Sequence, residues 1–180
     1  MYEVEAKFQL PDVDAFRRSL KQQGFAAQRT EDHIDRYLRH PTRDFAETDE
    51  ALRMRMVIRD RISVTVMTYK GPRDPGPVKA REEIETPVAN PTQMSAIFKS
   101  LGFTPAAVVE KRREVFTRDT TTVTIDTVTD VGTYAEVEQL ASGADRDAAA
   151  AVVLEVAAAL GLPDSAREPR SYLELLLAGD

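Results

Sequence analysis

Apolar and polar residues alternate along many short segments of this chain, which is the pattern of a strand with one buried face. In residues 2–8, Tyr, Val, Ala and Phe alternate with Glu3, Glu5 and Lys7. Further segments of this kind lie at 52–58, 63–69, 81–86, 108–117, 121–126 and 133–138. Residues 25–38 are mixed, and we expect them to be rich in strand. The segments 52–58 and 63–69 predict a hairpin that turns at Arg59-Asp60-Arg61.

Helical periodicity marks a second set of segments, at 11–24, 91–101, 145–160 and, more briefly, 171–177. Pro11 and Gly24 bracket the first of them, as proline and glycine often do at helix ends. Residues 42–50 and 71–77 are polar or rich in Gly and Pro, and predict loops. About eight strands, many of them adjacent in sequence, with three or four helices predict an α+β antiparallel fold. We expect residues 1–180 to form a single domain.

Composition excludes several classes of protein. The 180 residues include no Cys, so a disulfide framework, a thiolate metal site and a cysteine nucleophile are excluded. No apolar run approaches the ~18 residues of a membrane span, and no signal peptide is visible. We therefore expect a cytoplasmic protein with no membrane partner. The 24 basic and 30 acidic residues give a net charge of -6, which argues against nucleic acid and for a small anion in a local basic site.

Charged side chains share one face of strand after strand. Because side chains alternate between the two faces of a strand, the position of each charge follows from its parity. The bases placed in this way are Lys7, Arg53, Arg55, Lys70, Lys79, Arg81, Lys111 and Arg113. The acids are Glu3, Glu5, Glu83, Glu85, Asp126, Glu136 and Glu138. The first list holds four of the six Lys in the chain.

Two arrangements explain this pattern. In one, the charged faces point to solvent and the sheet is an ordinary half-exposed one. In the other, the sheet closes into a barrel of about eight strands whose charged faces line a cavity for one small ligand. Bases and acids in such a lining would compensate each other. They would suit a polyphosphate accompanied by Mg²⁺ or Mn²⁺, since Arg and Lys bind phosphate and clustered carboxylates bind these cations.

Seven elements follow one another in a distinctive order. They are E-x-E-x-K at residues 3–7, Leu-Arg-Met-Arg at 52–55, Thr-x-Lys-Gly-Pro at 68–72, R-x-E-x-E at 81–85, K-x-R at 111–113, Asp126, and Glu136 with Glu138. In this order they resemble the CYTH family, also called triphosphate tunnel metalloenzymes. That family includes class IV adenylyl cyclases, thiamine triphosphatases and inorganic triphosphatases. The resemblance covers at least residues 3–138.

The resemblance implies an eight-stranded antiparallel closed barrel, the triphosphate tunnel, with flanking helices. It implies that Mg²⁺ or Mn²⁺ is held by Glu3, Glu5, Glu136, Glu138 and Asp126. It assigns the triphosphate to Lys7, Arg53, Arg55, Lys70, Lys79, Arg81, Lys111 and Arg113. Glu5 and Asp126 are the catalytic candidates, although activation of the nucleophile by the metal is an equal alternative. Glu83 and Glu85 either join the site or position its bases.

The resemblance leaves the reaction open. Asp35-x-Tyr37 and the tail from Ser171 are similar to elements of the cyclase-type members, so we rank conversion of ATP to cyclic AMP and pyrophosphate first. Hydrolysis of inorganic, thiamine or nucleoside triphosphate is second, and a non-catalytic nucleotide or polyphosphate sensor is third. Tyr37 and Tyr172 are packing aromatics or catalytic groups. A homodimer is suggested by analogy, and His33 and His40 are expected at the surface or in loops.

Overall fold

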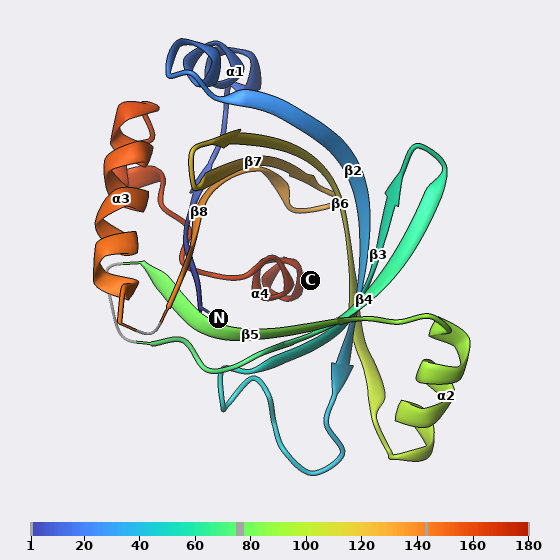
Figure 1. The fold of residues 1–180 in the computed structure, drawn as a ribbon. Coiled ribbons are helices and arrows are strands. Elements are labelled where there is room, and N and C mark those ends of the chain that lie inside the picture. The colour runs from blue at the N-terminus through green and yellow to red at the C-terminus, as the bar shows by residue number, and fades with distance from the viewer. Residues whose placement is uncertain (1, 75–77, 143, 180) are drawn as a thin grey trace.

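A closed antiparallel barrel of eight strands forms the body of the protein (Figure 1). The computed structural model describes residues 2–74, 78–142 and 144–179. Around the barrel the strands follow the order β1-β5-β4-β3-β2-β6-β7-β8, and each neighbouring pair is antiparallel. The predicted fold, an α+β closed barrel with flanking helices, is confirmed. No helix in the described ranges is long and apolar enough to cross a bilayer.

The element boundaries agree closely with the sequence pattern. The strands are β1 Tyr2–Gln9, β2 Ala26–Arg39, β3 Ala51–Arg59, β4 Ile62–Lys70, β5 Lys79–Pro87, β6 Thr104–Arg118, β7 Thr121–Val128 and β8 Gly132–Ala141. The helices are α1 Val13–Gln22, α2 Pro91–Ser100, α3 Arg146–Ala159 and α4 Tyr172–Ala178, with a short 3₁₀ turn at Asp164–Ala166. Strand β6 begins before the predicted residue 108, and it reaches back to Thr104, past an irregularity in its pairing with β2. Part of the predicted loop 71–77, namely 75–77, lies outside the described residues.

Local chemistry explains several of these boundaries. The Asp12 side chain accepts a hydrogen bond from the backbone of Ala15 and so caps α1. Asp60 and Arg61 both have positive φ, 51° and 66°, as a two-residue hairpin turn between β3 and β4 requires. Ser171 and Glu174 form a reciprocal capping box at the start of α4. The seven-residue helix α4 therefore has a fixed N-terminus.

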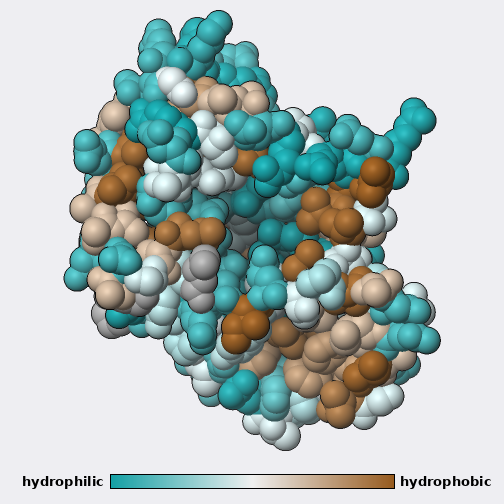
Figure 2. Space-filling view, viewed as in Figure 1, coloured by the Kyte–Doolittle hydropathy of each residue, from teal (hydrophilic) through white to brown (hydrophobic). Residues whose placement is uncertain are grey.

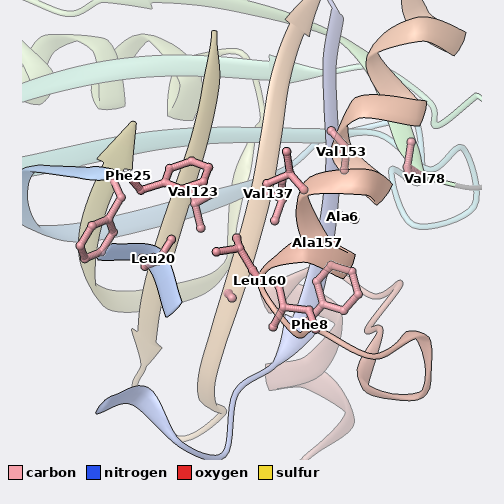
Figure 3. Packing of buried hydrophobic residues seen from close by; sticks show 14 of the residues in the cluster. Ala6, Phe8, Leu20, Phe25, Val78, Val123, Val137, Val153, Ala157 and Leu160 are labelled. Atoms are coloured by element: carbon pink, nitrogen blue, oxygen red, sulfur yellow. The ribbon is translucent and has the colours of Figure 1, made fainter. Parts of the chain in front are cut away.

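The main hydrophobic core lies outside the barrel wall. The apolar faces of β1, β7 and β8 pack against α1 and α3, as Figure 3 shows for Phe8, Val137 and Val153. A second cluster forms under α2, where Met54 and Met67 meet Phe98. Because the apolar faces point to the helices, the alternate positions of the same strands point into the barrel.

The charged faces of the strands turn inward, as parity predicts. Lys7, Lys111 and Asp126 are among the most buried side chains, with exposed fractions of 1%, 5% and 0%. The alternative of a half-exposed sheet with charges on the outside is therefore wrong. The expectation for His33 is also wrong: it is buried, because it shares the interior parity of Asp35 on β2.

Removal of a core leucine tests the helix-to-barrel packing. Leu20 on α1 is fully buried, whereas Leu101 at the end of α2 is 62% exposed. We expect Leu20→Ala to lower the free energy of unfolding by about 2–5 kcal/mol, from lost burial and the residual cavity. Leu101→Ala, the matched control, should change it by less than about 0.5 kcal/mol. Urea unfolding followed by circular dichroism measures both, and equal effects would contradict this packing.

Candidate functional site

A cavity of about 740 Å³ occupies the barrel interior and continues to one of its ends. Eight bases on the strands line it, namely Lys7, Arg53, Arg55, Lys70, Lys79, Arg81, Lys111 and Arg113. Three strand carboxylates line it as well, namely Glu3, Glu5 and Glu136. Figure 2 shows the molecule hollowed over the centre of the strand ring, with hydrophilic residues in the hollow. All eight predicted triphosphate-binding bases are thus brought together.

Asp35 is the counterion of the paired arginines. The Arg55 guanidinium donates to both Asp35 oxygens, at 2.6 and 2.7 Å, and Arg53 Nη1 donates to Oδ2 at 3.3 Å. Burial alone would raise the pKa of Asp35, but the two guanidinium charges outweigh it and hold that pKa well below its usual range. Asp35 is therefore a carboxylate that keeps two arginines charged and fixed inside the barrel.

Asp126 has the corresponding role on β7, two strands from β2 around the barrel. Lys111 Nζ donates to its Oδ2 at 2.8 Å, and Arg113 Nε donates to its Oδ1 at 2.7 Å. Arg113 also donates to Glu136, so one guanidinium joins β6, β7 and β8. Burial opposes ionisation of Asp126, yet Arg113 and Lys111 lower its pKa overall. Asp126 has no exposed surface and does not line the cavity. Glu5, the other catalytic candidate, does line it.

Three lysines complete the charged network. Lys70 forms ion pairs with Glu3, at 2.9 Å, and with Glu83. Burial would raise the pKa of Glu3, but Lys70 prevails and lowers it to about 2. Lys79 lies 3.5 Å from Glu5, and both Lys79 and Lys7 donate to the backbone carbonyl of Arg170. Burial and the charge of Lys79 lower the pKa of Lys7 to about 8.

Arg81 differs from the other cavity bases. Its side chain is 9% exposed and lines the cavity. Within the ranges that the structure describes, it makes no side-chain hydrogen bond or ion pair. Arg81 interacts electrostatically with Asp49 at longer range, but Asp49 pairs directly with Arg73, so an anion in the cavity would give Arg81 a direct partner.

The predicted metal carboxylates occupy adjacent strands. Glu5 on β1 lies opposite Glu138 on β8, and Lys7 lies opposite Glu136. Burial, followed by the charge of Glu3, raises the pKa of Glu138 to about 8. Oxygen donors that repel one another in this way have the chemistry that a hard divalent cation requires. Among the described residues, however, no three acidic or histidine side chains converge as a ready-made metal site, because the carboxylates lie against cationic partners.

Two further acids lie at the margin of the site. Glu83 is paired with Lys70, and Glu85 is exposed and accepts a hydrogen bond from Thr68 at 2.7 Å. Neither is among the cavity-lining residues. This placement favours the second of the two roles expected for them, that of positioning other groups.

Helix α4 brings an aromatic side chain into the cavity. In Figure 1, α4 lies within the ring of strands, and its Tyr172 lines the cavity. Lys7 Nζ lies 4.0 Å and Lys111 Nζ 4.9 Å from the centroid of the Tyr172 ring. Burial, followed by the charges of Asp126 and Glu136, holds the pKa of its hydroxyl well above the usual range. Tyr37 lines the cavity too, so both tyrosines singled out in the sequence lie at the site.

Sequence reasoning missed some neighbours of the site. His33 has its pKa lowered to about 3 by burial, then by the charges of Arg55 and Lys111, so it is neutral. Its strand parity with Asp35 and Tyr37 was the signal that could have placed it inside. The loop at 40–50 also lines the cavity, and nothing local in its polar sequence indicates that.

Comparison with known proteins gives one consistent result. The CYTH domain family matches residues 1–172. A Methanocaldococcus jannaschii protein named "Putative adenylate cyclase" is 35% identical over 97% of this chain and 98% of its own. A solved Pyrococcus horikoshii protein is 33% identical, with a TM-score of 0.90 and 99% of each chain covered. A Hippeastrum protein described with a dominant triphosphatase activity shares the fold at 18% identity, with a TM-score of 0.68 and coverage of 99% and 96%.

The raised pKa of Glu138 predicts a pH-dependent penalty on folding. The pKa of Glu138 is about 8 in the folded protein and near 4.5 in the unfolded chain, so the folded state holds its proton more tightly. The contribution of Glu138 to the free energy of unfolding is therefore highest below pH 4.5, and it falls progressively as the pH rises to about 8. In EDTA, we expect Glu138→Gln to raise the free energy of unfolding at pH 8.5 by at least about 1 kcal/mol, and to change it little at pH 4.5.

The control for this prediction is Glu155→Gln on the exposed face of α3, which should have little effect at either pH. Urea unfolding at the two pH values provides the measurement. A destabilised Glu138→Gln variant at pH 8.5 would show that the carboxylates of β1 and β8 do not repel one another.

Proposed function

The chain belongs to the CYTH family, and from this premise we propose that it is a divalent-metal-dependent enzyme acting on a triphosphate. One observation carries the proposal: eight bases and three carboxylates from six strands line a single cavity. We rank adenylyl cyclase activity first, since the M. jannaschii relative bears that name at 35% identity. Cytoplasmic location and a homodimer stay predictions.

The bases would bind and orient the triphosphate. Arg grips phosphate oxygens through two parallel hydrogen bonds, and Lys supplies a point charge. Asp35 and Asp126 lie behind these bases and hold their geometry before substrate arrives. Preorganised positive charge of this kind lowers the barrier by stabilising charge that develops on the phosphate oxygens. In this proposal Asp126 acts by positioning Lys111 and Arg113.

Glu3, Glu5, Glu136 and Glu138 would hold Mg²⁺ or Mn²⁺. When bound, the cation would neutralise phosphate charge and activate the attacking oxygen. Glu5 lines the cavity, and its nearest cation is Lys79 at 3.5 Å, which leaves it available as a ligand or as a proton acceptor. These four side chains come from two neighbouring strands, so one segment of the barrel wall would supply the whole set.

Two reactions can start from the same bound triphosphate. In cyclisation, the ribose 3'-oxygen forms a bond to the α-phosphorus, the bond to the β-phosphate breaks, and pyrophosphate leaves as the hydroxyl proton is lost. In hydrolysis, water forms a bond to the terminal phosphorus, the bond from that phosphorus to the bridging oxygen breaks, and the diphosphate part leaves while the water loses a proton, which gives orthophosphate. The charged walls serve both. The fold does not separate these reactions, since the Hippeastrum protein with its reported triphosphatase activity has the same one.

A product assay tests the proposal and ranks its alternatives. Purified protein is incubated with Mg²⁺ or Mn²⁺ and ATP, inorganic triphosphate or thiamine triphosphate, and the products are separated. We expect cyclic AMP and pyrophosphate from ATP. Orthophosphate alone would establish the triphosphatase alternative, and tight binding without turnover the sensor.

Glu5→Ala provides the site-specific arm of this assay. It should lower kcat at least about 100-fold with the unfolding temperature maintained, whereas Gln9→Ala, at the exposed end of the same strand, should leave kcat within about twofold. Full activity of Glu5→Ala would remove it from the site.

Arg81 gives a prediction in which triphosphate binding weakens while the stability of the fold does not fall. Because Arg81 forms no direct ion pair in the described protein, Arg81→Met should weaken triphosphate binding about tenfold and leave the unfolding temperature unchanged or higher. Arg113→Met should lower stability by about 3 kcal/mol, since it leaves Asp126 with Lys111 alone. Calorimetric titration and thermal unfolding measure both quantities. A destabilised Arg81→Met variant with unaltered binding would show that Arg81 has a structural role.

A further inference from the structure

The segment that leads into α4 contacts two of the cavity lysines. We call residues 167–171 the tail segment, and they lie between the 3₁₀ turn and α4. The backbone carbonyl of Arg170 accepts hydrogen bonds from both Lys7 and Lys79, the second at 3.2 Å. The backbone N–H of Glu168 donates to the Lys7 carbonyl at 2.8 Å, which joins the tail segment to β1. The Arg170 carbonyl therefore sets the positions of two ammonium groups in the cavity.

A carbonyl holds a lysine in a way that leaves its charge available to a phosphate. A backbone carbonyl carries no net charge, and each ammonium has three donors, of which the carbonyl takes one. The other neighbour of Lys79 is Glu5, 3.5 Å away, and a carboxylate neutralises the ammonium that it binds. Lys7 similarly lies opposite Glu136 in the pairing of β1 with β8. The position of the tail carbonyl thus decides how much of the lysine charge faces a ligand.

Arg73 binds the tail segment on both sides of that carbonyl. Its Nη1 donates to the Pro169 carbonyl at 3.1 Å, and its Nη2 lies 3.2 Å from a carboxylate oxygen of Glu174 on α4. Glu174 in turn forms the capping box of α4 with Ser171. One guanidinium is therefore tied to the residue before Arg170 and to the helix that follows it.

Asp49 anchors Arg73 to the loop at 40–50. Its Oδ2 accepts from the backbone N–H of Arg73 at 3.0 Å and from Nε at 2.8 Å, and its Oδ1 lies 2.7 Å from Nη2. Asp49 also interacts electrostatically with Arg81 at longer range. The direct partner of Asp49 is thus Arg73, and Arg81 is the next cation that it could bind.

Arg73 makes these contacts from outside the cavity. Asp49 and Glu174 line the cavity, whereas Arg73 does not. Its side chain is 27% exposed, and ion pairs that are partly exposed contribute little to stability. Its planar fork of donors nevertheless fixes three partners in one geometry, which the single ammonium of a lysine cannot do. These features indicate a role in geometry and not in stability.

We propose that Arg73 is a positioning residue for triphosphate binding. It holds the tail carbonyl on its two lysines, and it keeps Asp49 away from Arg81. Three bases on β1 and β5 thereby present their charge to the ligand. The inference rests on the proposed function of the cavity, and it assigns a role to a side chain that does not itself reach the ligand.

Binding of inorganic tripolyphosphate tests the inference. The ligand is titrated calorimetrically into the wild-type protein and Arg73→Met, in EDTA so that metal-dependent turnover does not consume it. We expect Arg73→Met to weaken binding about tenfold, because the bases lose their orientation. The unfolding temperature should fall by less than about 4 °C. A larger fall would give Arg73 a structural role and overturn the inference.

Arg112→Met is the matched control for the lost charge. Arg112 is 64% exposed on β6 and pairs with Asp32 at 3.3 Å. Its replacement removes the same single positive charge, and the affinity should stay within about twofold of wild type. An equal loss in both variants would mean that only net charge matters, and it would overturn the positioning role.

Arg73→Lys separates position from charge at the same place. Lysine keeps the positive charge but lacks the planar fork that binds three partners together. We expect its affinity to lie within about threefold of Arg73→Met. Wild-type affinity in Arg73→Lys would overturn the inference.

A double-mutant cycle shows whether Arg73 acts through the lysines. In a Lys79→Met background, Arg73→Met should weaken binding only about threefold, because one of the groups that it positions is gone. In an Arg55→Met background it should keep its tenfold effect, to within about twofold, since Arg55 is held by Asp35 instead. Equal effects in the two backgrounds would overturn the inference.

The outcomes also separate this inference from the proposed function. Tripolyphosphate that binds the wild-type protein and Arg73→Met equally would overturn the positioning role and leave the triphosphate site in place. Failure of the wild-type protein to bind tripolyphosphate would overturn both proposals.

Discussion

Compensation of buried charge is the constraint on which the rest of this structure depends. A closed barrel removes its interior from bulk water, and each ionised side chain there must find a partner or lose its charge. Asp35 meets this requirement for Arg53 and Arg55, and Asp126 meets it for Lys111 and Arg113. These pairs allow a densely charged interior to exist in a stable fold. They also fix the bases in place before any ligand arrives.

Compensation is incomplete where a ligand would bind. Arg81 forms no direct ion pair within the described residues, and the pKa of Glu138 is raised to about 8 by burial and by Glu3. Each is an unfavourable local state in the protein alone. A triphosphate with its cation would supply the anion and the positive charge that these groups lack. The groups that destabilise the protein alone are thus the same groups that would bind the ligand.

The barrel and its inward charges could be predicted because strand parity is a local property. Glu3, Glu5 and Lys7 share a face whatever else the chain does, and the same holds for Glu136 and Glu138. The pairing of Asp35 with Arg55 depends on the register between β2 and β3, which parity does not determine. His33 was misplaced because its isolated position suggested no role. The loop at 40–50 and the C-terminal helix α4 line the same cavity only in the folded chain, so no local pattern indicates that they meet.

The central claim is that the barrel interior holds a triphosphate with its cation. A crystal structure of the protein grown with ATP and Mn²⁺, with the anomalous signal of manganese recorded, tests this most directly. The account predicts phosphate density within hydrogen-bond distance of Arg81 and Arg113, and a manganese peak beside Glu5 and Glu136. Phosphates bound on the outer surface, with manganese away from β1 and β8, would contradict it.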